Sequence, residues 1–341
     1  MPKTHVTIPF FIPHYGCRHR CVFCNQVYTT NTTTLPDEAY ITQKIERYLQ
    51  TIKPAVTHVE IAFFGGSFTG LNKEIQQKYL TIAHRYYLLH KIDGIRLSTR
   101  PDYIDNETLS LLKVYNVSTV ELGAQSMHDD VLEQSHRGHT VQDTLNASRL
   151  IKEYGFNLII QLMPGLPGDT YEKSIETAYK TISLRPDGVR IYPTVVIRDT
   201  KLETLYREGK FVPLTLDEAI DLCANLYAIF VDNNIPVIRM GLHPFDDAVA
   251  DTIIAGPYHP SFGFLVKSRY YRDTLELQIK KYLQHNSNIQ TLSIELPEHK
   301  IAEYYGPHKE NIDFLRNVFN TIPLQFYSAN IQEPVIRNTV V

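Results

Sequence analysis

The chain has 341 residues, of which 43% are hydrophobic and 21% are charged, and its formal net charge is −3. This composition is ordinary for a folded globular protein, and the near-neutral charge excludes the indiscriminate attraction to nucleic acid that strongly basic proteins show. No apolar run approaches the ~20 residues that a membrane-spanning helix needs, and the first residues, MPKTHVTIPFF, are unlike a signal peptide. We therefore expect a cytoplasmic protein with no membrane partner.

Short β-type segments alternate with longer helical segments in the first part of the chain. The predicted strands are residues 7–12, 59–64, 95–99, 117–122, 156–162 and 188–192. The predicted helices between them are residues 37–51, 73–90, 106–115, 140–154 and 171–184. Because the strands are almost continuously apolar or β-branched, they fit parallel strands that are covered by helices and joined by right-handed crossovers. Eight such units would close a barrel, so six predict an α/β fold with an open, six-unit (β/α) partial TIM barrel.

The pattern changes after a further amphipathic helix at residues 216–233. Beyond Pro236 the strand–helix alternation is lost, and the chain becomes rich in Tyr, His and Pro. Helical patterns at residues 262–284 and 308–320 and a short strand at 290–295 indicate a second, smaller unit. We therefore predict two domains, which are a barrel core over residues 1–235 and a C-terminal α/β extension of unknown role over residues 236–341.

Three of the four cysteines form a tight motif directly after the first predicted strand. Cys17, Cys21 and Cys24 have the spacing C-x3-C-x2-C, which is short enough for three thiolates to converge on one soft metal centre. Structural zinc and ordinary electron-transfer iron–sulfur clusters need four protein ligands, and the fourth cysteine, Cys223, is far along the chain. The motif therefore favours a [4Fe-4S] cluster with one iron left open for another ligand.

Other interpretations of the cysteines remain open. His14 or His19 would complete a zinc site, and a non-catalytic metal-binding or scaffold protein would use the three cysteines structurally. A disulfide is disfavoured because a cytosol keeps thiols reduced. Cys223 lies in LDEAIDLCANLYAIF among apolar residues at helical spacing, so we expect a small buried side chain there.

The cysteine motif, preceded by the apolar run TIPFFI and followed by Asn25, resembles that of the radical S-adenosylmethionine superfamily. Further segments resemble the core of the Elongator catalytic subunit family and, more distantly, oxygen-independent coproporphyrinogen oxidase. These segments are GGSFTGL, STRPDY, ELGAQS with SHRGHT, LMPGLPGDT and IYPTVVIRDTKLETLYREGKF. The resemblance covers roughly residues 5–230 and implies that cluster and cofactor lie at the top of the barrel. The residues after the core are too few for the acetyltransferase domain with which the Elongator family continues.

Each predicted strand carries candidate ligand-binding residues at its carboxyl end, where parallel α/β folds bind their ligands. Gly65 and Gly66 allow close approach of the backbone to a ligand, and the resemblance implies that they hold the methionyl amino group. Ser67 stands where relatives have an acidic residue. Gln125 and Arg137 suit ribose hydroxyls and the methionine carboxylate. The remaining residues that we expect to bind the cofactor are Ser98, Arg100 and Gln161, and the two histidines that flank Arg137, His136 and His139, are expected to be solvated.

The resemblance implies a radical enzyme that reductively cleaves S-adenosylmethionine to methionine and a 5′-deoxyadenosyl radical. This radical abstracts hydrogen from a substrate that the sequence does not identify. Family likeness points to RNA, and a small molecule or tetrapyrrole is the alternative. An electron donor such as flavodoxin or ferredoxin would reduce the cluster. Tyr258 and His259, in the segment GPYHP, are candidate catalytic residues that would reach over the barrel mouth.

Overall fold

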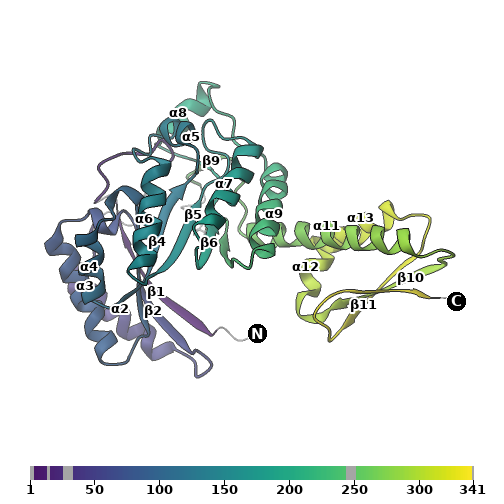
Figure 1. Ribbon diagram of the computed structural model, residues 1–341, viewed down its shortest axis with the longest axis horizontal. Helices are drawn as coiled ribbons and strands as arrows, with labels where there is room; N and C mark the ends of the chain where they lie inside the picture. Colours follow the sequence, from purple (N-terminus) through teal and green to yellow (C-terminus); the bar gives the residue numbers. More distant parts are fainter. Residues whose placement is uncertain (1–3, 14–15, 26–33, 243–250, 340–341) are drawn as a thin grey trace.

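The structure is a computed structural model that describes residues 4–13, 16–25, 34–242 and 251–339 (Figure 1). It has two parts, which are a curved sheet covered by helices and a smaller unit that contains the C-terminus. Among the described residues, no helix has the length and apolar character required to cross a membrane.

The core is a parallel sheet of seven strands in the order β1-β2-β3-β4-β5-β6-β8, and every neighbouring pair in it is parallel. Its strands are β1 (His5–Ile12), β2 (His58–Gly65), β3 (Gly94–Thr99), β4 (Val117–Gln125), β5 (Asn157–Leu162), β6 (Gly188–Ile191) and β8 (Val237–Met240). This topology confirms the predicted α/β partial barrel. It adds one strand, β8, which lies beyond the boundary expected at residue 235, and the division into two domains stays a prediction.

Helices connect successive strands and cover the outer face of the sheet (Figure 1). They are α2 (Glu38–Thr51), α3 (Lys73–Leu88), α4 (Asn106–Val114), α6 (Val141–Glu153), α7 (Tyr171–Ser183) and α9 (Leu216–Asp232). A polar side chain accepts a hydrogen bond from the first turn of each, which satisfies an otherwise unpaired N–H group. All six were predicted from the sequence. The shorter elements α5 (Asp129–Gln134), α8 (Lys201–Arg207), β7 (Val196–Ile197) and β9 (Ile253–Ala255) were not.

The two faces of the sheet differ in chemistry because successive side chains on a strand point to opposite faces. On β2, Val59, Ile61 and Phe63 are buried in the apolar core, whereas Glu60 lies on the other face. There it begins a buried chain of ion pairs. Arg96 Nη2 lies 2.9 Å from Glu60 Oε2, and Arg96 Nη1 lies 2.8 Å from Glu121 Oε1. Arg190 Nη2 lies 3.1 Å from the same oxygen of Glu121, so four successive inward-facing charges alternate in sign.

The smaller unit begins with the long helix α11 (Phe262–His285). Its sheet pairs β10 (Thr291–Pro297) in parallel with β11 (Leu324–Ala329) and antiparallel with β12 (Val335–Thr339). The helices α12 (Ile301–Tyr305) and α13 (Glu310–Val318) connect β10 to β11. The first part of α11 packs in the barrel core through Phe262 and Val266. Its second part packs in a separate core through Leu275 and Ile279, so one helix serves both units.

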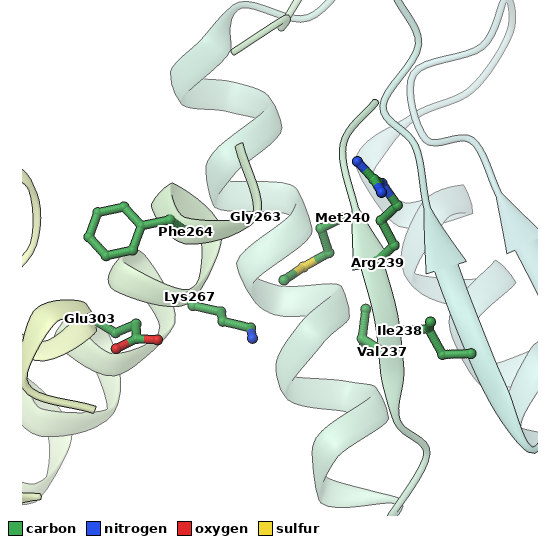
Figure 2. A pocket seen from close by; sticks show the side chains of 8 residues that line it. All are labelled: Val237, Ile238, Arg239, Met240, Gly263, Phe264, Lys267 and Glu303. Carbon is green, nitrogen blue, oxygen red and sulfur yellow. The ribbon is translucent and has the colours of Figure 1, made fainter. Parts of the chain in front are cut away.

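A cavity of about 230 Å³ lies where β8 meets α11 (Figure 2). Its lining combines apolar side chains with three charged ones, which are Arg239, Lys267 and Glu303. Figure 2 shows that these charged groups come from the strand, from α11 and from α12. The cavity lies on β8, which is the strand at the opposite end of the sheet from β1, so it is separate from the cysteine loop that follows β1.

Replacing Arg96 by alanine should lower the free energy of unfolding by about 3–5 kcal/mol, because it leaves the buried carboxylates of Glu60 and Glu121 without their shared cation. Denaturant unfolding measures the change. Arg149→Ala is the matched control, since it breaks an exposed pair with Glu153 that contributes at most about 1 kcal/mol. Equal losses in the two variants would contradict a stabilising role for the buried chain of charges.

Candidate metal and cofactor site

The three cysteines lie together in the loop that follows β1. All three are half-buried free thiols. Burial raises the pKa of Cys24 to about 12, and the charges of Cys21 and Cys17 raise it further, so the sulfurs are close enough to repel one another as thiolates. Burial also raises the pKa of Cys17, and a hydrogen bond from the Ser67 backbone opposes this. The thiols therefore converge beside the double glycine, and the raised pKa values of Cys17 and Cys24 mean that a positive centre would favour their ionisation.

Glycines allow the cysteine loop to approach the end of β2. A Cβ added at Gly16, whose φ is +84°, would lie 2.3 Å from the Ser67 carbonyl oxygen. A Cβ at Gly70 would lie 2.0 Å from the Gly16 carbonyl oxygen. Gly65 has φ +98° and touches the backbone of Ile12, to whose carbonyl Gly66 N donates at 2.7 Å. Side chains at these positions would push the two segments apart.

The third residue of the GGS segment is tied to the end of β3. Ser67 is 2% exposed, its Oγ accepts from the backbone N of Arg100 at 3.1 Å, and it lies 3.2 Å from Thr99 Oγ1. The hydroxyl therefore links the β2 exit to the β3 exit. Ser98 lies half-buried one residue earlier on β3.

Two buried arginines lie beside the thiols, and each has an unsatisfied N–H group. Arg137 Nη1 donates to Cys21 Sγ at 3.2 Å, and its Nη2 donates to the Gly123 carbonyl oxygen. Arg100 binds Asp102 through Nε and Nη2, at 2.9 and 3.0 Å. Arg137 Nε and Arg100 Nη1 are buried without a hydrogen-bond partner among the described residues. Because an unpaired buried donor is costly, these atoms fit a site that receives an anionic acceptor.

A bulge at the end of β4 places an amide pair next to these groups. The register of β4 against β5 shifts between Gly123 and Gln125, and Gln125 has φ +69°. Such bulges often re-aim a side chain beside an active site. Gln125 Oε1 accepts from Gln161 Nε2 at 3.1 Å, so the two predicted amide residues do meet.

His139 was expected to be solvated, and the structure contradicts this expectation. The residue is 4% exposed, and burial together with the neighbouring charges of Arg137 and Arg100 lowers its pKa to about 2. It is therefore neutral at any physiological pH. The sequence SHRGHT gave no periodicity from which to infer burial, because the segment is a loop between α5 and α6.

The candidate catalytic residues follow a strand pair, β7 and β9, that contacts the cysteine loop. Tyr258 and His259 are half-buried and follow β9, which pairs with β7. Asn25 Nδ2, at the end of the cysteine loop, donates to the Arg198 carbonyl oxygen just after β7 at 3.2 Å. His259 Nδ1 accepts from Ser261 N at 3.0 Å, so this nitrogen is used locally where α11 begins.

Of the two histidines proposed for a zinc site, the structure describes only His19. His14 lies outside the described residues. His19 is exposed, and a Cβ on Gly138 would lie 2.6 Å from its ring. The His19 ring therefore packs on the loop that carries Arg137.

In metal-free protein, Cys24 should react with iodoacetamide at least about tenfold more slowly at about pH 8 than an ordinary thiol of pKa ~8.5. The reason is that its raised pKa keeps it protonated, and the rate should rise with pH. Peptide mass spectrometry after timed alkylation measures this rate. Urea-unfolded protein is the control, in which Cys24 should react like any thiol, and fast reaction in the folded protein would contradict the raised pKa.

Two family profiles match the chain. That of the Radical SAM superfamily matches residues 11–180, and that of the Radical_SAM C-terminal domain matches residues 186–272. The solved structure of archaeal Methanocaldococcus infernus Elp3 with an N-terminal deletion superposes with a TM-score of 0.65 at 23% sequence identity. It covers 81% of this chain and 64% of that chain, which shows a shared fold.

Curated proteins are similar to part of the chain. Elongator complex protein 3 of Bos taurus is 31% identical over 201 residues, which are 53% of this chain and 37% of that protein. The tRNA uridine(34) acetyltransferase of Methanocaldococcus jannaschii is 35% identical over 136 residues, which are 39% of this chain and 25% of that protein. The matched segments thus span 37% and 25% of the length of these two relatives. On these matches and the shared fold, the chain belongs to the radical S-adenosylmethionine superfamily of enzymes, and within it is similar to Elongator complex protein 3.

Proposed function

We propose that Cys17, Cys21 and Cys24 hold a [4Fe-4S] cluster whose open iron binds S-adenosylmethionine. The observation that carries this proposal is the convergence of three thiols with two incompletely paired guanidinium groups at the double glycine. Three thiolates on one side of a cluster leave one metal site for an exogenous chelate. A cluster held by these three cysteines would supply one electron for the reductive cleavage of S-adenosylmethionine.

The protein residues position the cofactor in this proposal. Arg137 donates a hydrogen bond to Cys21 through Nη1, and its positive charge acts to lower the pKa of Cys17 and Cys24. Gly65 and Gly66 present backbone without side chains at the end of β2. Arg100, with Nη1 unpaired and buried, is suited to a carboxylate, and the Gln125–Gln161 pair is suited to hydroxyl groups.

We propose RNA as the substrate class to test first, because similar proteins include the archaeal enzyme named tRNA uridine(34) acetyltransferase. A small molecule or tetrapyrrole is the competing class. We further propose that the protein works in the cytoplasm and receives electrons from a flavodoxin or ferredoxin. These assignments rest on the family and not on a contact of this chain.

Anaerobic reconstitution with iron and sulfide should give a brown protein that cleaves S-adenosylmethionine under dithionite. Replacement of any one of Cys17, Cys21 and Cys24 by serine should abolish cleavage, because the cluster loses a ligand. Cys223→Ser is the matched control and should retain cleavage, since Cys223 is buried in the helix α9 core. A colourless protein with one stoichiometric zinc ion would instead support a structural scaffold.

Substrate identity requires a second measurement, which is isotope transfer from deuterated substrate into 5′-deoxyadenosine. Deuterium arriving from bulk labelled tRNA would support the RNA class. Transfer only from small-molecule extracts would support the competing class and overturn the RNA assignment, while leaving the cleavage reaction intact.

Gly16→Ala should lower the iron bound per chain after reconstitution, because its methyl group would collide with the Ser67 carbonyl and displace the cysteine loop. Iron and sulfide assays measure the loss. Gly209→Ala separates this collision from backbone strain, since Gly209 also has positive φ, +70°, but has nothing within 4 Å of the added Cβ. Equal iron contents in the two variants would show that the close approach is not needed.

A further inference from the structure

A second group of metal-binding side chains lies at the far end of the same two strands. His5 is the first residue of β1 and lies directly opposite His58, the first residue of β2. Glu60 is two residues further along β2, so it projects from the same face as His58. The cysteine loop follows the other end of β1, seven residues later, which at ~3.3 Å per residue is about 23 Å away. This group is therefore separate from the cysteine site.

The three side chains turn their donor atoms toward one point. His5 Nε2 lies 2.9 Å from Glu60 Oε2, and His58 Nε2 lies 3.5 Å from Glu60 Oε1. The two imidazole rings are neighbours, with centroids 4.7 Å apart. One ligand atom from each residue lies within 4.8 Å of the other two. A modest closure of this triangle brings all three to the ~2.0–2.2 Å bond lengths of zinc.

The two oxygens of the Glu60 carboxylate differ in the number of contacts that they make. Oε2 is bound by Arg96 through Nε at 3.1 Å and Nη2 at 2.9 Å, and His5 Nε2 approaches the same atom. Oε1 has only the longer contact with His58 within the part of the chain that the structure describes. Arg96 therefore holds the carboxylate from behind, as outer partners of metal ligands do, and leaves one oxygen free to coordinate.

Access and charge also suit an ion. The Glu60 side chain is 3% exposed, but the side chains of His5 and His58 are 44% and 41% exposed, so an ion and its water ligands can reach the site from solvent. The positive charge of Arg96 is offset in part by Glu121, with which it forms a second ion pair. The charges of Glu60, Arg96, Glu121 and Arg190 sum to zero, so they give the site no net positive charge that would repel an ion.

We propose that His5, His58 and Glu60 bind a divalent transition-metal ion of the zinc class, with water completing the coordination. Two imidazoles and one carboxylate are the mixed nitrogen and oxygen set that zinc accepts, whereas magnesium and calcium prefer oxygen alone. The ion cross-links the start of β1, which is the edge strand of the sheet, to β2. Its role is structural and is independent of the cysteine cluster.

The test uses full-length protein with Cys17, Cys21 and Cys24 replaced by serine, so that the thiolates do not compete for the probe. Calorimetric titration with Zn²⁺ should find one ion per chain. His5→Ala or His58→Ala should weaken binding by at least about tenfold, which is the smallest loss typical even of outer-shell changes. His299→Ala, at an exposed histidine of the C-terminal unit, is the control and should leave binding unchanged.

Thermal unfolding gives a readout that does not depend on calorimetry. Zn²⁺ should raise the midpoint of the serine-substituted parent and of His299→Ala but not that of His5→Ala, because a ligand stabilises only the state that binds it. His5→Gln, which keeps a polar side chain, serves if the alanine variant fails to fold. The proposal is wrong if the parent binds no Zn²⁺, or if it binds one ion that neither histidine substitution weakens.

Discussion

The close approach of two backbone segments, at Gly16 against Ser67 and at Gly70 against Gly16, is the constraint on which the candidate site depends. It brings a loop after β1 onto the exit of β2, and it thereby places three sulfurs beside the double glycine. No side-chain interaction can substitute for this contact, since any Cβ would occupy the space of a carbonyl oxygen. The positions of Arg100 and Arg137 matter only because this contact has already placed the thiols within their reach.

Much of the core was predictable because its signals are local. The helix caps Asp105 and Thr140 begin helices within one residue of the expected starts. The apolar strands of a parallel sheet carry an equally clear signal. By contrast, β7 has two residues and β9 has three, which is too short for any periodicity. The strand β8 follows Pro236 directly, and its neighbours in the sheet are set by the tertiary fold and not by its own sequence.

The residues of the candidate site were predictable from the sequence, but the contacts between them were not. That Ser67 would tie two strand exits together, and that His139 would be buried, depends on loops whose course the sequence does not specify. The buried chain of charges did have a signal. Four strands each carry a single charged residue among mostly apolar or β-branched ones, and these residues are Glu60, Arg96, Glu121 and Arg190. Such an isolated charge on a buried strand needs an opposite charge on the neighbouring strand, so the four together indicated a polar inner face.

The continuity of α11 has a mechanical consequence. Its 24 residues rise about 36 Å without interruption, and its two halves are anchored in different apolar cores. A helix anchored in this way connects the two units rigidly and does not act as a flexible linker. The sheet of β10, β11 and β12 is therefore held in a fixed position relative to the barrel (Figure 1). Any molecule bound to that sheet would also be held in a fixed position relative to the barrel.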